Sequence, residues 1–251
     1  MLSDQELLRY SRHLFLPEID VTGQQALADS RVLVLGAGGL GSPVLMYLAA
    51  AGVGHLAISD PDVVDLSNLQ RQVIHTTERI DQSKVASAAA QIQALNPHVN
   101  LTLLDHSLTE TDLRVQTELA TVVVVGTDNF VSRHAANRAC LTTKTPLVSA
   151  AATAWEGQIT VFDPRQPTSP CFACLYPAGD DQTLNCAETG VVSPLVGILG
   201  SYQALEALKV ITSAGEPLVG RLQLFDAKLG SWQTLRLKRN PSCPACGNAT
   251  V

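Results

Sequence analysis

The stretch RVLVLGAGGLGS, residues 31–42, joins an apolar run to a glycine-rich turn. Its glycines follow the spacing Gly36-x-Gly38-x-x-Gly41 of the dinucleotide fingerprint, which allows a tight turn and close approach of the backbone to a phosphate. A helix that begins near Ser42 adds free N–H groups and the positive end of a helix dipole. The pattern predicts a nucleotide site, and the competing interpretation is that the glycines only permit the turn. The fingerprint alone does not name the nucleotide.

Outward from this turn, strand-like and helix-like segments alternate. Apolar, β-branched runs predict strands at 31–36, 55–59, 99–104, 121–126 and 146–150, and three- and four-residue periodicity predicts helices at 42–52, 84–95 and 129–141. This order is typical of a mostly parallel sheet with helices on both faces. A strand at 157–163, a helix at 193–212 and two alternating strands at 221–227 and 232–238 follow. We therefore expect an α/β, Rossmann-like mixed sheet with an antiparallel C-terminal extension, and no regular structure from 164 to about 192.

Composition excludes several classes of function. The 251 residues are 46% hydrophobic and 16% charged, which is a globular composition, and the net charge is 17 − 23 = −6. An acidic chain without a polybasic run is not expected to bind nucleic acid or a membrane surface. The N-terminus, MLSDQELLRYSRHLFL, lacks the apolar core of a signal peptide, and no apolar stretch is expected to reach the length needed to span a bilayer. We expect a soluble, cytoplasmic protein.

Polar side chains follow the second predicted strand. Asp60 stands about twenty residues after the glycine turn, where a carboxylate can bind ribose hydroxyls. The loop that follows carries Asn68, Gln70, Arg71 and Gln72, and Lys84 opens the next helix. A guanidinium, an ammonium group and several amides suit a triphosphate better than a nicotinamide. A solvated polar loop is the alternative.

A second carboxylate follows the fourth strand, in the sequence GTDN. Asp128 and Asn129 would lie at the same sheet edge, where a carboxylate can hold Mg²⁺ against phosphate oxygens. Alternatively, Asp128 caps the helix that begins near Phe130. These groups together predict a site for ATP and Mg²⁺ rather than for hydride transfer.

The six cysteines include two C-x-x-C pairs, Cys171/Cys174 and Cys243/Cys246. Four thiolates can close a tetrahedral structural Zn²⁺ site, which would attach the C-terminal segment to the loop after residue 164. Redox-active pairs are the alternative. Cys140, in a predicted helix, is expected only to pack.

The motifs LGAGGLGS, DLSNLQRQ and GTDN, with Lys84 and the paired cysteines, resemble the ubiquitin-activating-type adenylyltransferases of sulfur-carrier pathways, the MoeB/ThiF/HesA family. The resemblance runs from LLRYSRH to CPACG. It implies a homodimer that adenylates the C-terminal carboxylate of a small ubiquitin-like carrier ending in Gly-Gly, before sulfur displaces AMP. It also implies one domain over 1–251, with an N-terminal helical segment (1–30), a nucleotide-binding half (31–155) and a carrier-binding and zinc half (156–251).

The resemblance assigns roles to particular residues. Gly39 would approach the phosphates and Arg12 would reach the ATP of the other subunit; read alone, Arg12 is a charge on an amphipathic helix. Cys186 would accept sulfur, or would simply be a buried small side chain. The nucleotide contacts implied are Gly36, Gly38, Gly39, Gly41, Asp60, Ser67, Asn68, Leu69, Gln70, Arg71, Lys84, Asp128 and Asn129.

The carrier is not decided by the motifs. EGQITVF and NPSCPACG favour the molybdopterin synthase small subunit, whereas RYSR, NCAETGVV and RLQLFDAKLGSWQTLRL are closer to the thiamine branch. Because the chain stops soon after CPACG, we expect an external sulfur donor of the cysteine desulfurase or rhodanese type. The remaining hypotheses are an NAD-dependent oxidoreductase and a non-catalytic, zinc-stabilised interaction module.

Overall fold

The computed structural model describes residues 2–177 and 190–247 of the chain. Within these residues the strands form one eight-stranded sheet in the order β3-β2-β1-β4-β5-β6-β7-β8. The strands are β1 Arg31–Leu35, β2 His55–Ser59, β3 Asn100–Leu104, β4 Val122–Val125, β5 Leu147–Thr153, β6 Glu156–Phe162, β7 Arg221–Asp226 and β8 Ser231–Arg236.

The parallel part of the sheet runs from β3 to β5, with β1 paired to both β2 and β4. Its central strands are apolar on both faces because helices cover both. Val32 and Val34 of β1 belong to one hydrophobic core, and Leu33 and Leu35 to the other. The strand order reverses between β1 and β4, and this switch point is where open α/β sheets bind ligands.

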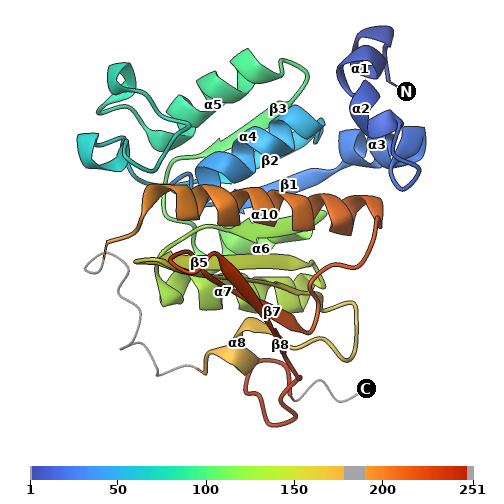
Figure 1. Ribbon diagram of the computed structural model, residues 1–251, viewed down its shortest axis with the longest axis vertical. Coiled ribbons are helices and arrows are strands. Elements are labelled where there is room, and N and C mark those ends of the chain that lie inside the picture. The colour runs from blue at the N-terminus through green and yellow to red at the C-terminus, as the bar shows by residue number, and fades with distance from the viewer. Residues whose placement is uncertain (1, 178–189, 248–251) are drawn as a thin grey trace.

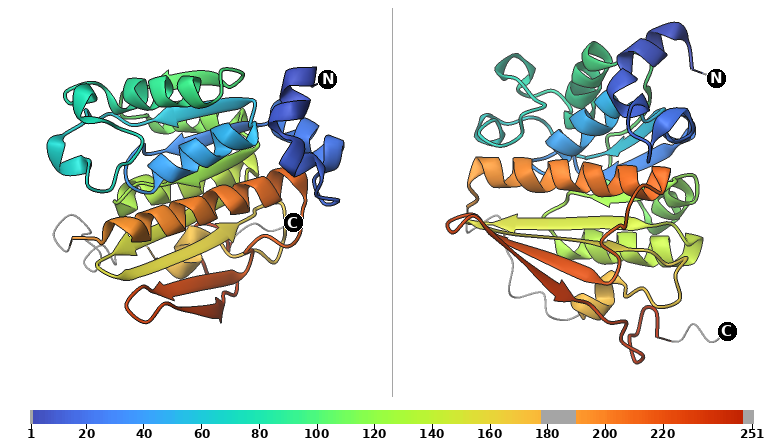
Figure 2. Two further views of the ribbon diagram at one scale, coloured as in Figure 1. Left: turned by 45° about the horizontal axis from the view of Figure 1, so that its top comes forward. Right: turned by 45° about the vertical axis from the view of Figure 1, so that its right-hand side comes forward.

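Helices cover the two faces unequally (Figures 1 and 2). On one face, α4 (Gly41–Ala51), α5 (Lys84–Leu95) and α10 (Ser193–Thr212) enclose the larger core, and α10 lies across the sheet beside α4. On the other face lie α6 (Glu110–Glu118), α7 (Phe130–Thr143) and the short α8 (Phe172–Leu175). The N-terminal helices are α1 Asp4–Arg9, α2 Ser11–Leu14 and α3 Asp20–Asp29.

The C-terminal strands extend the same sheet. β6 is antiparallel to β5, and β7 and β8 add further antiparallel pairs, so β8 is the sheet edge (Figure 2). The expected α/β mixed sheet with an antiparallel extension is confirmed.

Three expectations need correction or completion. The stretch from 164 to 192 does contain regular structure, because α8 forms one helical turn there. Helix α6 was not predicted at all. Helix α10 is long and apolar enough to cross a bilayer by length and composition, so the expectation that no stretch reaches that length is wrong. Half of that helix is buried in the structure, where it packs on β5, β6 and α4 as a core helix does.

Candidate functional site

The glycine turn between β1 and α4 forms one wall of a cavity of about 620 Å³, within the usual size of ligand pockets. Gly36 has a φ of +97°, which favours glycine, and a Cβ on Gly41 would overlap the carbonyl oxygen of Gly36. Gly38 and Gly39 line the cavity. Among the described residues no protein acceptor pairs with their N–H groups, so these groups can bind an anion.

Asp60 follows β2 and lies on the cavity wall with its carboxylate almost fully buried. Its Oδ2 accepts the N–H of Ala37 at 2.8 Å, and its Oδ1 accepts the N–H of Asp62 at 3.0 Å. The carboxylate therefore holds the glycine turn against the loop after β2. The structure places Asp60 where a ribose-binding group was predicted, with one oxygen already engaged by the turn.

The loop after β2 contains two 3-10 helices, Leu66–Asn68 and Thr77–Arg79. Arg71 lines the cavity, and its Nη1 donates to the carbonyl of Ser67 at 3.2 Å. Of the residues singled out in this loop from the sequence, Arg71 and Gln72 form part of the lining. The other four, Ser67, Asn68, Leu69 and Gln70, lie outside it.

Lys84 begins α5, as predicted, and is 6% exposed. Its Nζ lies 2.7 Å from Asp62 Oδ2 and 3.9 Å from Asp60 Oδ1. Lys84 and Arg71 thus bring two positive charges to the end of the cavity beside the glycine turn.

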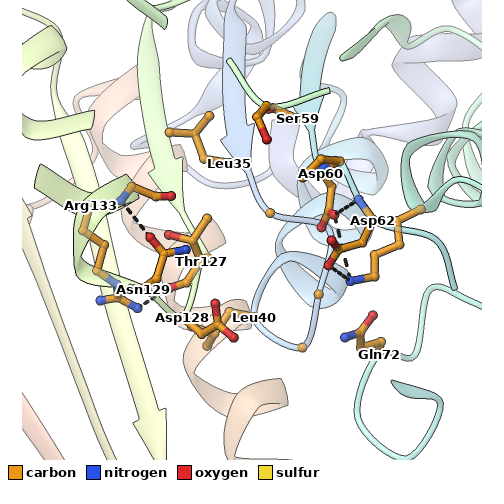
Figure 3. Close-up of a pocket in the computed structure, with 18 of the residues that line it drawn as sticks. Leu35, Leu40, Ser59, Asp60, Asp62, Gln72, Thr127, Asp128, Asn129 and Arg133 are labelled. Carbon is orange, nitrogen blue, oxygen red and sulfur yellow. Dashed lines mark hydrogen bonds and ion pairs between the residues drawn. The ribbon is translucent and has the colours of Figure 1, made fainter. Parts of the chain in front are cut away.

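Asp128 and Asn129 lie in the loop after β4, across the cavity from Asp60 and Asp62 (Figure 3). The side chain of Asn129 caps α7 by accepting the N–H of Ser132 at 2.8 Å. The alternative that Asp128 caps this helix is therefore wrong. Asp128 is exposed on the cavity wall and is free to bind a ligand or metal ion.

Sequence reasoning missed Arg133, which is buried in α7 and also lines the cavity. Its Nε and Nη2 donate to the carbonyl of Thr127 at 3.0 and 2.6 Å, and Nη2 donates to the carbonyl of Ala150 at 2.8 Å. Arg133 thus fixes the loop that carries Asp128 to the end of the parallel sheet. Little in the sequence distinguishes Arg133, because it is one of two arginines in the predicted helix at 129–141.

Part of the cavity lining is uncharged. Leu108 and Leu113 contribute apolar surface beside His106 and Ser107 of the segment after β3, and Leu35 adds apolar surface at the end of β1. The lining residues after β3 were not predicted, because α6 was missed. The capping box formed by Thr109 and Asp112 at its start was the available signal.

Two buried oxygens at the cavity have no hydrogen-bond partner among the described residues, Gln72 Oε1 and Thr127 Oγ1. Buried polar atoms are normally paired. Both residues line the cavity, on opposite sides of it (Figure 3).

The four paired cysteines come together, as predicted. Their Sγ atoms all lie within 4.8 Å of one another, with Cys171 to Cys174 at 3.8 Å, Cys171 to Cys243 at 3.7 Å and Cys174 to Cys246 at 3.5 Å. A tetrahedral zinc site with Zn–S bonds of about 2.3 Å separates its sulfurs by about 3.8 Å, whereas a disulfide needs about 2.05 Å. The donor set therefore fits Zn²⁺.

The four thiols differ in their surroundings: burial raises the pKa of Cys171 and of Cys246, whereas hydrogen bonding favours the thiolate of Cys243. Burial acts to raise the pKa of Cys243, but the N–H groups of Cys246 and Ala245 outweigh it and hold this pKa below its ordinary value. None of the four cysteines lines the cavity. Cys140 is buried in α7, apart from the cluster, and burial raises the pKa of its thiol.

Arg12 and Cys186 remain to be placed among the predicted residues. Arg12 is exposed on α2 and does not line the cavity. Cys186 lies outside the described residues.

The Rossmann-like sheet, its glycine turn and the charged cavity at the switch point define a nucleotide-binding protein, and residues 10–245 match the ThiF family model. The chain belongs to the ThiF family. It is 44% identical over 246 residues to the molybdopterin-synthase adenylyltransferase of Escherichia coli K12, covering 98% of each chain. It is 43% identical over 250 residues to the sulfur carrier protein ThiS adenylyltransferase of the same organism, covering 100% of this chain and 99% of the relative.

A solved structure has the same fold at lower identity. The crystal structure of E. coli MccB with ATP superposes with a TM-score of 0.83 at 22% identity, covering 95% of this chain and 73% of that chain. The family and its named relatives identify the protein as an adenylyltransferase.

Proposed function

We propose that this protein adenylates the C-terminal carboxylate of a small ubiquitin-like sulfur-carrier protein ending in Gly-Gly. A carboxylate oxygen of the carrier attacks the α-phosphorus of ATP, the bond between the α- and β-phosphates breaks, and pyrophosphate leaves. The product is an acyl-adenylate, in which the carbonyl is activated for later attack by sulfur.

One observation carries the proposal. The unpaired N–H groups of Gly38 and Gly39, the charges of Lys84 and Arg71, and the carboxylate of Asp128 face one cavity. The first four groups stabilise the negative charge of a triphosphate, and the reaction needs positioning and charge neutralisation more than covalent catalysis. The apolar lining residues Leu108 and Leu113 suit the base.

Asp128 is the residue we assign to Mg²⁺. A carboxylate is a ligand that Mg²⁺ prefers, and this one is exposed to the cavity without capping α7. The ion would supply further positive charge to the phosphates. Asn129 keeps the loop in place through its cap, and Arg133 does so through the carbonyl of Thr127.

The remaining assignments follow the same proposal. Ser67, Asn68, Leu69 and Gln70 would contact ATP after a small movement of their loop, and Arg12 would do so from the other subunit of a homodimer. We treat 1–251 as one domain whose C-terminal half binds the carrier and a structural Zn²⁺. We place the protein in the cytoplasm and its sulfur donor on a separate protein.

The named relatives belong to two pathways. The two named relatives act on the molybdopterin and thiamine branches and differ by one percentage point of identity, 44% against 43%. We retain the molybdopterin synthase small subunit as the favoured carrier and the thiamine-pathway carrier as the alternative. An oxidoreductase is disfavoured, because Arg71 and Lys84 in the cavity lining suit a triphosphate better than a nicotinamide, and the named relatives are adenylyltransferases.

The test is ATP–pyrophosphate exchange with a panel of purified carriers ending in Gly-Gly, each compared with a version lacking its last two residues. We expect exchange with one intact carrier and none with its truncated form. The molybdopterin carrier should be the active one. No exchange with any carrier, in protein shown to bind Mg-ATP, would contradict the proposed substrate.

A further inference from the structure

His75 is a buried histidine that the proposed reaction does not use. It is 6% exposed, lies in the loop after β2, and does not line the cavity. Its Nε2 lies 2.9 Å from the carbonyl oxygen of Ala37, and its Nδ1 lies 2.9 Å from Ser87 Oγ on α5. The ring therefore connects α5 to the middle of the glycine turn.

The partners determine which ring nitrogen carries the proton. A carbonyl oxygen can only accept, so Nε2 of His75 must be the donor to Ala37. In the neutral ring Nδ1 then accepts from the hydroxyl of Ser87. Burial lowers the pKa of His75, and the charges of Lys84 and Arg79 lower it further, against the opposing effects of the Ala37 hydrogen bond and Asp60.

The hydrogen bond from His75 to the carbonyl of Ala37 also fixes the orientation of the next N–H group, that of Gly38. The carbonyl of Ala37 and the N–H of Gly38 belong to one planar trans peptide, so they point in opposite directions. Holding the carbonyl toward His75 turns the N–H of Gly38 away from it. On the other side of Ala37, its own N–H is held by Asp60 at 2.8 Å.

We propose that His75 is a positioning residue for the glycine turn: through Ala37 it orients the N–H of Gly38 toward a phosphate of the bound nucleotide. This rests on the ATP site proposed above. His75 touches neither nucleotide nor carrier in this role, and its effect passes through the backbone alone.

The test compares two substitutions in the full-length protein. In His75→Gln the amide nitrogen reaches about as far as Nε2 and can still donate to Ala37. In His75→Asn it reaches only as far as Nδ1, which leaves the carbonyl unpaired. By calorimetry we expect the Kd for Mg-ATP to rise about tenfold in His75→Asn, and to stay within about threefold of wild type in His75→Gln. His98→Asn, at an exposed histidine away from the cavity, is the matched control.

A purely structural role would lower the stability of both variants without separating their affinities for Mg-ATP. Equal affinity of His75→Asn and wild type would overturn the proposal. Wild-type protein that binds no Mg-ATP would overturn both the proposed function and this inference.

A second measurement tests the proposal even if His75→Asn does not fold. Nitrogen-15 NMR of the nucleotide-free wild type should show His75 protonated on Nε2 and not on Nδ1. The opposite tautomer would remove the hydrogen bond to Ala37, and with it the proposal.

Discussion

The ammonium group of Lys84 lies 2.7 Å from Asp62 Oδ2, which joins the first turn of α5 to the loop after β2. The backbones of the two residues are also bonded, since the N–H of Lys84 donates to the carbonyl of Asp62 at 3.0 Å. The side chain of Lys84 is 7% exposed and that of Asp62 is 65% exposed. The pair therefore holds the buried ammonium group of Lys84 in one position, while the carboxylate of Asp62 remains exposed to solvent.

We expect loss of the Lys84 ammonium group to lower activity far more than stability. In Lys84→Met the lost pair with Asp62 is largely screened, but the buried carboxylate of Asp60 loses the cation 3.9 Å away, so the free energy of unfolding should fall by about 1–3 kcal/mol. The phosphates lose a buried cation, and pyrophosphate exchange should fall about 100-fold or more. Lys228→Met, at an exposed lysine in the turn between β7 and β8, should change neither quantity. Unfolding of Lys84→Met at room temperature would contradict this account.

Adjacent residues after β4 should give opposite results. Asn129→Ala removes the cap of α7 and should cost about 1 kcal/mol in urea denaturation. Asp128→Asn should leave stability nearly unchanged, because Asp128 is exposed and caps nothing, yet it should abolish Mg²⁺-dependent exchange. If Asp128→Asn retained wild-type exchange, the assignment of Asp128 to Mg²⁺ would be wrong.

The lowered pKa of His75 has a consequence for acid stability. The unfolded chain takes up a proton near pH 6.5, whereas the folded His75 stays neutral to lower pH. The unfolded state then binds more protons, so this residue makes stability fall as the pH drops below about 6.5. His75→Gln removes that contribution. The free energy of unfolding of wild type relative to this variant should therefore decline between pH 7.5 and 5.5 in urea titrations, and a constant difference would contradict it.

The cysteine cluster should act on stability and not on the nucleotide site. Cys174→Ser removes one of four thiolate ligands, so zinc content measured by elemental analysis should fall well below one ion per chain. The thermal midpoint should fall with it. Binding of Mg-ATP should persist while the protein is folded, because the cluster does not line the cavity. Cys140→Ser, at a buried cysteine outside the cluster, should keep its zinc.

Much of the fold could be predicted because its signals are local. The apolar runs at 31–35 and 122–125 are buried strands, and the periodic segments at 84–95 and 193–212 are helices with those bounds. Helix α6 escaped prediction because its sequence, ETDLRVQTE, is mostly polar and buries few side chains. Without it, the residues of the loop after β3 could not be placed at the cavity.

The sequence by itself determined the order of the strands along the chain, the glycine turn, and the chemistry available after β2 and β4. It also showed that two C-x-x-C pairs could bind one ion. These features depend on spacing within short windows, where backbone geometry leaves few choices.

Only the tertiary structure decided which of these groups meet. Lys84 pairs with Asp62, His75 bonds to Ala37, and Cys171 lies beside Cys243. Each contact joins residues far apart in the chain. Its formation depends on how the helices pack on the sheet, and on the need to pair polar groups once packing has buried them.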